Sequence, residues 1–309
     1  MNELRDRVVG EIRKVVVGQD HIVDVLLAAA SVGGHVLLEG VPGVAKTLIA
    51  NAFARAVGVE FRRVQFTPDM LPSDLTGTMT LREGTLNFRP GPVFTNLLSA
   101  DEINRTPPKT QAALLEAMQE RQVSADGVAR ALPDPFIVVA TQNPIEYEGT
   151  YPLPEAQLDR FLAKLDVGYP TPTDEAAMLH LGHHGVAPAT LNDVNAVSSP
   201  AELVATRAEV DSTTVNDAIV DYVVALVRKT RELPSVALGA SPRAAVHLLA
   251  ASKAAARLTG RDFVIPDDVA AVAPAVLRHR ITLRPEAELE HYRADDAVAT
   301  AISSVPVPR

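Results

Sequence analysis

The segment from Gly40 to Thr47, with the sequence GVPGVAKT, constrains the fold of this 309-residue chain more than any other. It follows the apolar run 35–39 (HVLLE), which is typical of a buried strand, and it opens the helical pattern 46–57. Such a glycine-rich turn binds phosphate, because its backbone N–H groups and the positive end of the helix dipole point at the anion. The sequence therefore predicts a nucleotide site built on a parallel sheet.

The residues of this loop have distinct predicted roles. We expect Lys46 to neutralise the terminal phosphates of ATP and the Thr47 hydroxyl to be a ligand of Mg²⁺. Ala45 stands where the motif usually has its last glycine, and the sequence does not show whether its methyl group strains the loop. The alternative, a turn that merely precedes a Lys-Thr helix, is disfavoured by the agreement of strand, loop and helix. The predicted nucleotide contacts are Gly40, Val41, Pro42, Gly43, Val44, Ala45, Lys46 and Thr47.

Three further polar residues follow apolar strands. The run 97–101 ends in Asp101, and Glu102 comes next. Asn143 follows the run 136–141 in the same way. Because the carboxyl ends of parallel strands line the ligand crevice, we expect Asp101 to hold Mg²⁺, Glu102 to polarise the attacking water and Asn143 to orient a water or the γ-phosphate. An acidic strand end or an Asn-Pro turn alone would be weak evidence for a catalytic site. Together with the phosphate loop, both features support one.

Two arginines are candidate catalytic cations. Arg160 is a candidate arginine finger, which stabilises transition-state charge, and the alternative is a surface arginine paired with Asp159. Arg243 follows an expected helix cap, Ser241, and a first-turn proline, Pro242. A cation there opposes the helix dipole, so an anion should compensate it. The γ-phosphate is the candidate for that anion, and an ordinary salt bridge is the alternative.

The order of predicted elements indicates an α/β domain followed by a helical one. Strands are expected at 35–39, 61–66, 97–101, 136–141 and 163–167, and helices between them at 46–57, 107–120 and 154–162. Beyond residue 173 the pattern is helical throughout, with helices expected at 174–182, 211–232, 241–258 and 266–279 and a linker at 185–200. We therefore predict a nucleotide-binding αβα domain over residues 1–190 and a smaller all-α domain over residues 191–309.

Two antiparallel hairpins interrupt the strand–helix alternation. The first pairs 76–81 with 85–89 around Gly84, and the second pairs 122–125 with 128–132 around Asp126-Gly127. An Asp-Gly pair between strand-like runs is a strong signal for a two-residue turn. The alternative is that both are ordinary edges of the main sheet.

Composition narrows the classes of function. The chain has 29 Lys and Arg against 38 Asp and Glu, a net charge of −9, and only 4% aromatic residues, which argues against a duplex nucleic-acid binder. It has no cysteine, so disulfides and thiolate metal sites are excluded. His180 and His184 share a helix face without a clear third ligand, so no metal site is expected there. No membrane-spanning run or signal-peptide pattern is evident, and the cytoplasm is the expected location.

In their order along the chain, these motifs resemble those of the AAA+ ATPases. More narrowly, the chain is similar to the MoxR family from about residue 17 to residue 308, in the blocks 65–75, 89–92, 100–105, 107–111, 114–122 and 141–161. Ala45 is a familiar variant within that family. The resemblance implies an AAA+ αβα domain with a central parallel sheet and an all-α lid. It also implies that Val17 and Gly18 flank the adenine and that both hairpins face the pore of a ring.

The family resemblance also carries functional expectations. It implies an ATPase with ATP and Mg²⁺ as cofactors, active as a chaperone-like factor that remodels or matures partners with a von Willebrand factor A domain. It further implies a homo-oligomer, usually hexameric, in which we expect Arg160 to complete the neighbour's site. The alternatives are an AAA+ motor acting on nucleic acid and an ATP-binding scaffold with little hydrolysis. The acidic charge disfavours the first, and the Asp101–Glu102 pair disfavours the second.

Overall fold

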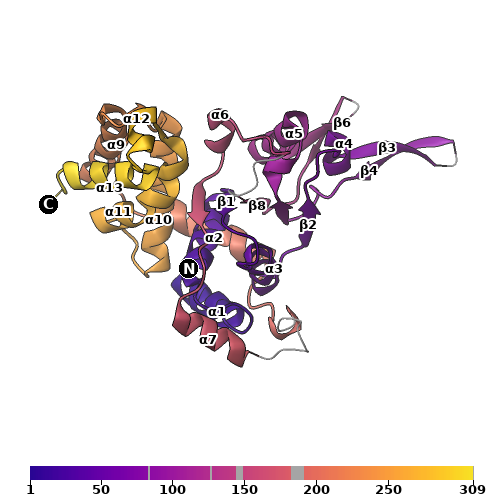
Figure 1. The fold of residues 1–309 in the computed structure, drawn as a ribbon. Helices are drawn as coiled ribbons and strands as arrows, with labels where there is room; N and C mark the ends of the chain where they lie inside the picture. Colours follow the sequence, from indigo (N-terminus) through magenta and orange to yellow (C-terminus); the bar gives the residue numbers. More distant parts are fainter. Residues whose placement is uncertain (83, 126, 144–148, 182–190, 309) are drawn as a thin grey trace.

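A five-stranded parallel sheet forms the centre of the computed structural model, which describes residues 1–309 except 83, 126, 144–148, 182–190 and 309 (Figure 1). Along the sheet the strand order is β2-β5-β8-β1-β9, so that β1 lies between β8 and β9. All five predicted strands are confirmed, each within about a residue at either end. Their bounds are β1 (Val36–Glu39), β2 (Phe61–Gln65), β5 (Leu97–Asp101), β8 (Ile137–Gln142) and β9 (Ala163–Asp166).

Helices cover both faces of this sheet. Side chains alternate across a strand, so Ile137 and Val139 of β8 pack with the first three helices, whereas Val138 and Ala140 pack with α5. This period of two produces the αβα layers that the sequence predicts. The helices of this part are α1 (Asn2–Ile12), α2 (Asp20–Val32), α3 (Lys46–Ala56), α4 (Pro72–Thr76), α5 (Pro108–Glu120), α6 (Glu155–Leu158) and α7 (Pro172–His180), with a 3-10 turn η1 (Ile103–Arg105).

One predicted helix is wrong in its length. The pattern 154–162 favours a single helix, but α6 ends at Leu158. The next four residues form a turn that enters β9, and the backbone carbonyls of Asp159, Phe161 and Leu162 accept hydrogen bonds from Arg280 instead of from a continuing helix. The backbone N–H of Leu162 donates to His35 O at the start of β1. Tertiary contacts thus override the local helical pattern.

Both hairpins are present and lie outside the main sheet. The first consists of β3 (Gly77–Arg82) and β4 (Thr85–Pro90), and the second of β6 (Gln122–Ala125) and β7 (Val128–Ala131). Each forms its own two-stranded sheet, so the alternative of ordinary sheet edges is wrong. The β3–β4 hairpin projects away from the body (Figure 1). Residues 83 and 126 in the two turns lie outside the described part of the chain.

The C-terminal part is helical except for one short sheet. Its helices are η2 (Leu191–Asp193), α8 (Pro200–Asp211), α9 (Asp217–Glu232), α10 (Pro242–Leu258), α11 (Pro266–Leu277), η3 (Arg278–Arg280), α12 (Pro285–Leu289) and α13 (Ala294–Ser304). The exception is the antiparallel pair of β10 (Val236–Leu238) and β11 (Thr282–Leu283). The predicted helix 211–232 is wrong at its start, because Asn216 caps α9 and residues 200–211 form a helix of their own.

The two parts of the chain are packed together. α10 contacts α2, and apolar residues of both parts belong to one continuous buried cluster. In Figure 1 the helices α9 to α13 lie on one side of the sheet and the β3–β4 hairpin projects on the other. The expected boundary near residue 190 stays a prediction. Within the described residues, no helix has both the length and the apolar character that a membrane crossing requires.

Candidate functional site

The loop between β1 and α3 curls around the side chain of Lys46. Its ammonium donates hydrogen bonds to Gly40 O at 2.6 Å and Val41 O at 2.8 Å. Burial lowers the pKa of Lys46, and the charges of Asp101 and Glu102 oppose that shift. A side chain at position 40 would not fit, because a Cβ atom there would lie 2.3 Å from Val167 O. The loop is therefore held close to the end of the sheet with a cation at its centre.

Ala45 adopts a left-handed backbone conformation, with φ 62° and ψ 21°, immediately before α3. This conformation costs an L-residue about 1–2 kcal/mol, because its Cβ atom crowds the following carbonyl. The question that the sequence leaves open is thereby resolved. The alanine at this position does strain the loop.

Asp101 is the centre of a hydrogen-bond network at the end of β5. Its Oδ2 accepts from Thr47 Oγ1 at 2.8 Å and from Arg63 Nε at 2.7 Å, and its Oδ1 accepts from Ser99 Oγ at 2.7 Å. The carboxylate is almost fully buried, with 4% of the side chain exposed. Because the Thr47 hydroxyl donates its proton to Asp101, its lone pairs remain available to a metal. Hydroxyl and carboxylate oxygens are the donors that Mg²⁺ prefers, so this pair fits the ion.

Glu102 follows Asp101 with a left-handed backbone, at φ 58°. Its Oε2 accepts from Gln65 Nε2 at 2.7 Å and pairs with Arg105 Nε at 3.1 Å. Its backbone N–H donates to Thr141 Oγ1 at 3.0 Å, which ties it to the end of β8. The carboxylate is thus held at the carboxyl edge of the sheet, beside Asp101.

Asn143 comes directly after β8 and is buried. β8 lies between β5 and β1, so Asn143 occupies the same edge of the sheet as Asp101 and the loop. Four predicted site residues from two strand ends and a helix start therefore converge there, namely Thr47, Asp101, Glu102 and Asn143. Within the described residues, no group of three or more His, Asp or Glu side chains could hold a metal, and His183 and His184 lie outside that part of the chain.

An apolar cavity of about 430 Å³ lies beside the loop. Val17 lines it, whereas Gly18 lies next to it with φ 75° and packs against Asp174. The left-handed backbone at Gly18 favours glycine, and a Cβ atom there would also lie 2.5 Å from Asp174 Oδ2. Apolar walls suit the flat face of a nucleotide base. The opposite wall is formed by residues that no sequence motif marks, namely Tyr169, Pro170, Met178, Leu179 and Leu181.

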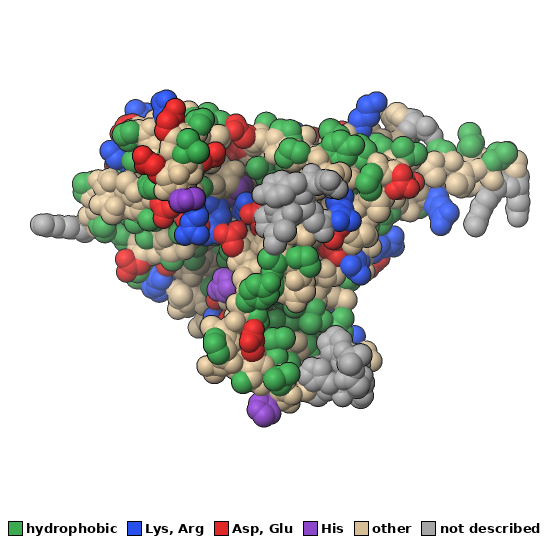
Figure 2. All heavy atoms as spheres, viewed as in Figure 1, with side chains coloured by type: hydrophobic (Ala, Val, Ile, Leu, Met, Phe, Trp, Pro, Cys, Tyr) green, Lys and Arg blue, Asp and Glu red, His purple; other side chains and the backbone are tan. Residues whose placement is uncertain are grey.

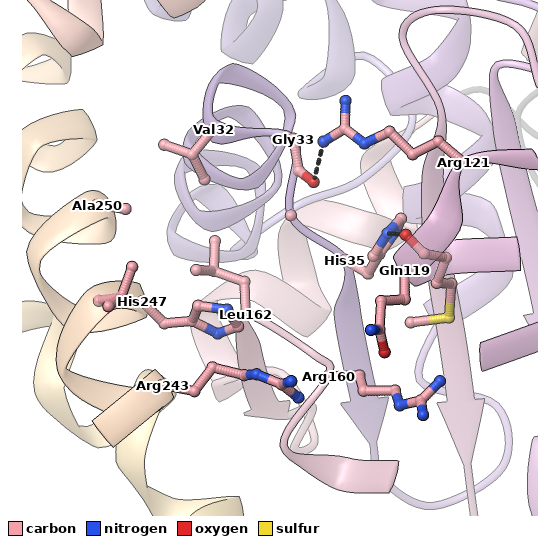
Figure 3. A pocket seen from close by; sticks show the side chains of 13 residues that line it. Val32, Gly33, His35, Gln119, Arg121, Arg160, Leu162, Arg243, His247 and Ala250 are labelled. Carbon is pink, nitrogen blue, oxygen red and sulfur yellow. Dashed lines mark hydrogen bonds between the residues drawn. The ribbon is translucent and has the colours of Figure 1, made fainter. Parts of the chain in front are cut away.

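Arg160 and Arg243 lie elsewhere, in a second cavity of about 320 Å³ (Figure 3). They reach into it from the segment before β9 and from the first turn of α10, and Gly34 and His35 form part of its wall. His35 precedes β1, whereas the phosphate loop follows β1, so the two sites lie at opposite ends of the parallel strands. Neither arginine is therefore placed to reach the loop of its own chain.

The two arginines differ in their hydrogen-bonding partners. Arg160 Nη1 donates to Leu115 O at 2.8 Å. Asp159, the alternative partner for Arg160, instead pairs with Arg280 at 2.7 Å and lies 3.8 Å from Arg243 Nη1. The salt-bridge alternative for Arg243 is thus present as a long contact on a half-exposed side chain, and such pairs contribute little.

Two neutral histidines line the same cavity. Burial lowers the pKa of His35 and of His247 to about 4. Val138 N donates to His35 Nδ1, so the proton of His35 is on Nε2, which donates to Met118 O. Arg280 donates to His247 Nδ1 at 2.6 Å. The cavity therefore presents guanidinium charge without histidine charge at neutral pH.

Comparisons with known proteins agree with this architecture. The family model described as "ATPase family associated with various cellular activities (AAA)" matches residues 35–163, and that of the AAA lid domain matches residues 228–301. YeaC, an uncharacterized protein of Bacillus subtilis, is 49% identical over 100% of this chain and 96% of its own length. Chaperone MoxR1 of Mycobacterium tuberculosis is 45% identical over 98% of this chain and 82% of its own length. Protein MoxR of Methylorubrum extorquens is 36% identical over 96% and 93% of the two chains.

Solved structures give the same result for the fold. The crystal structure of a candidate ATPase from Cytophaga hutchinsonii superposes with a TM-score of 0.90 at 40% identity, covering 99% of this chain and 96% of that one. An MCM homolog from Methanopyrus kandleri shares the fold alone, with a TM-score of 0.59 at 19% identity over 98% of this chain and 61% of that one. Sequence, fold and site geometry agree, and the chain belongs to the MoxR family of AAA+ ATPases.

Proposed function

We propose that this ATPase uses Mg²⁺-bound ATP, works as a homo-oligomeric ring, and acts as a chaperone-like factor on partner proteins. The observation that carries the proposal is the division of its candidate site residues between the two ends of the sheet. Thr47, Asp101 and Glu102 lie at the carboxyl end. Arg160 and Arg243 share a cavity at the amino end. Each chain then contributes one half of a site to each of two neighbours.

The chemistry at the carboxyl end follows from the residues that lie there. Thr47 and Asp101 would hold Mg²⁺, which supplies charge neutralisation on the phosphates. The N–H groups of the loop and Lys46 would hold the phosphates in place. Glu102 would polarise the attacking water, and Asn143 would orient that water or a γ-phosphate oxygen. Most of this catalysis is positioning and electrostatic stabilisation.

The positions of the two arginines support the proposed ring. An arginine finger accelerates phosphoryl transfer by roughly 10³–10⁵ in rate, so a site without one turns over slowly. A neighbour that presents Arg160 and Arg243 to the loop would supply both cations. Such a head-to-tail contact closes into a ring when its rotation allows, and six subunits is the family's usual number. We therefore expect specific activity to rise with protein concentration, with a hexamer populated mainly in nucleotide.

Mixing two inactive variants tests this division. Arg160→Ala leaves Glu102 intact, and Glu102→Gln leaves Arg160 intact, so mixed rings contain interfaces where both are native. We expect either variant alone to be nearly inactive and their mixture to recover turnover. The matched control mixes Lys46→Ala with Glu102→Gln, whose defects lie in the same half-site, and should recover nothing. Absence of recovery with the first pair would contradict the ring mechanism.

The partner class is the second part of the proposal. We propose clients that contain a von Willebrand factor A domain and meet the ring at its two hairpins, and we place this work in the cytoplasm. One relative is named a chaperone, which supports the general class. The test is capture by a Glu102→Gln ring held in ATP, with Lys46→Ala as the control that cannot hold nucleotide. A von Willebrand factor A-domain protein retained only by the former supports the proposal, and nucleic acid retained in its place would contradict it.

A further inference from the structure

Arg280 is a buried guanidinium that joins the helical part to the segment carrying Arg160. It lies in η3, and only 1% of its side chain is exposed. Its Nε donates to Asp159 Oδ1 at 2.7 Å. A buried charge of this kind is costly unless ion pairs and hydrogen bonds compensate it, so its partners define what the residue does.

Those partners are concentrated on residues 159–162. Arg280 donates to Asp159 O at 3.0 Å, to Phe161 O and to Leu162 O at 3.2 Å. Its other partners lie in the helical part, at Val276 O of α11 and His247 Nδ1 of α10. Since Arg160 lies within this segment, one guanidinium connects the backbone around Arg160 with two helices of the lid.

Asp159 extends the same connection to Arg243. Its carboxylate accepts from Ser241 Oγ, at 3.2 Å from Oδ1 and 3.1 Å from Oδ2. Ser241 is also the N-cap of α10, since its Oγ accepts from Ala244 N. The helix that carries Arg243 in its first turn is thus joined to the residue preceding Arg160. Asp159 and Arg280 thus link the backbone around Arg160 to the start of the helix that carries Arg243.

We propose that Arg280 and Asp159 are positioning residues that hold Arg160 and Arg243 as one rigid pair for hydrolysis at the neighbouring subunit. This inference rests on the proposed function, in which those arginines act across the interface. A movement of the lid then moves both cations together. Changes at Arg280 or Asp159 should leave nucleotide binding at the chain's own loop unchanged, because that loop lies at the other end of the strands.

Arg280→Lys is the first test variant, because it keeps the charge but loses the forked donors. A single ammonium cannot reach the Asp159 carboxylate, the carbonyls of residues 159, 161 and 162 and His247 together. Asp159→Asn is the second, since it keeps the size of the side chain and an acceptor for Arg280. The control is Arg278→Lys, two residues away, which joins Asp166 of β9 to Asp295 of α13 and does not touch the 159–162 segment.

We expect kcat to fall about 10- to 100-fold in Arg280→Lys and Asp159→Asn, as for a displaced catalytic group. The affinity for a fluorescent ADP analogue should stay within about twofold, because the own-chain loop is intact. Mixing either variant with Glu102→Gln should recover turnover, since the native arginines then come from the partner subunit. Arg278→Lys should keep native kcat.

Three results would overturn the inference. The first is a native kcat in Asp159→Asn, and the second is a loss of nucleotide affinity as large as the loss of kcat. The third is a loss of turnover in either variant that mixing with Glu102→Gln does not restore. Asp159→Asn decides the question if Arg280→Lys does not fold. Two mixtures separate this inference from the proposed function. If Arg160→Ala mixed with Glu102→Gln recovers turnover but Arg280→Lys mixed with Glu102→Gln does not, this inference alone is overturned. Failure of both pairs would overturn the proposed function as well.

Discussion

Ala45 and Glu102 both have positive φ values, 62° and 58°, and both lie where nucleotide is expected to bind. Backbone strain of this kind is commonly found at functional sites, where the surrounding structure holds it in place. Asp101 is held differently, by side chains from three elements. Thr47 and Arg63 donate to it together with Ser99. At the scale of single residues, the site combines strained backbone with a carboxylate that three hydrogen bonds hold in place.

The sequence predicts the residues of the motif but not the residues that position them. Arg63, Gln65 and Arg105 hold Asp101 and Glu102. Gln65 and Arg105 fall within the blocks that resemble the family, but no motif predicts that they hold these carboxylates. The contacts of Arg63 and Gln65 depend on the register of β2 beside β5, in which Gln65 is opposite Asp101. That register is a property of the assembled sheet, which explains why local sequence patterns did not reveal it.

Replacing Ala45 by glycine should stabilise the protein. Glycine removes the strain of the left-handed conformation, about 1–2 kcal/mol, and costs about 0.4–1 kcal/mol through the freer unfolded chain. The expected net gain is between about 0 and 1.6 kcal/mol in the free energy of unfolding, measured by urea denaturation. The control is Ala112→Gly at an exposed position in α5, which should lose about 1 kcal/mol. Equal losses in both variants would show that Ala45 is not strained.

Acid should destabilise the protein through His35. The pKa of this fully buried histidine is about 4 in the folded chain, against 6.5 for the free group, because burial penalises its charged form. Between these values the unfolded chain binds more protons, so the free energy of unfolding falls as the pH falls, by about 3 kcal/mol at most. His35→Asn keeps an acceptor for Val138 N and should flatten this dependence. Identical pH profiles of unfolding would contradict the assignment.

At the scale of elements, the two hairpins and the strands of the main sheet were predictable, but β10, β11 and the limits of some helices were not. Asp126-Gly127 and the alternating runs beside it identify the second hairpin from local sequence. The end of α6 depends on Arg280, which is more than 100 residues away in sequence. α8 was missed although Ser199 and Pro200 give it the same Ser-Pro start as α10, so that signal could have been used.

The two hairpins are joined and carry apolar side chains near their tips. Arg130 of β7 lies 4.0 Å from the ring centre of Phe88 in β4, a cation–π contact that links them. Leu81 and Leu86 face each other across β3 and β4, with 70% and 63% exposed. Apolar side chains near the projecting hairpin are visible in Figure 2. Exposed apolar groups at a projecting element suit contact with a protein client.

Replacing Leu81 and Leu86 by serine should separate client work from chemistry. Both side chains are exposed, so the midpoint of urea unfolding should change little. Basal ATP hydrolysis should stay within a few-fold of native, while stimulation by a client is lost. Leu289→Ser, at an equally exposed leucine of α12, should keep that stimulation. Normal stimulation of the double variant by a client would show that the client contacts another surface.

At the scale of the whole molecule, the chain carries two incomplete half-sites at opposite ends of one sheet. The sequence predicts the fold class, because strand–helix alternation and the phosphate loop are local signals. It also provides Arg160 and Arg243 as candidates, but not their shared cavity. That cavity arises because α10 packs against α2 at the amino end of β1. The packing of the lid thus places both arginines in the half-site at the amino end of the sheet.

The most direct test of the whole account is the separation of ATP binding from ATP hydrolysis in Glu102→Gln. The substitution keeps the size of the side chain and removes the carboxylate that polarises water, while Thr47 and Asp101 stay native. We predict an affinity for ATP within a few-fold of native and a turnover reduced by about 10²-fold or more, measured by equilibrium binding and by phosphate release. Phosphate release at the native rate would contradict the assignment of Glu102 and, with it, the mechanism of the site.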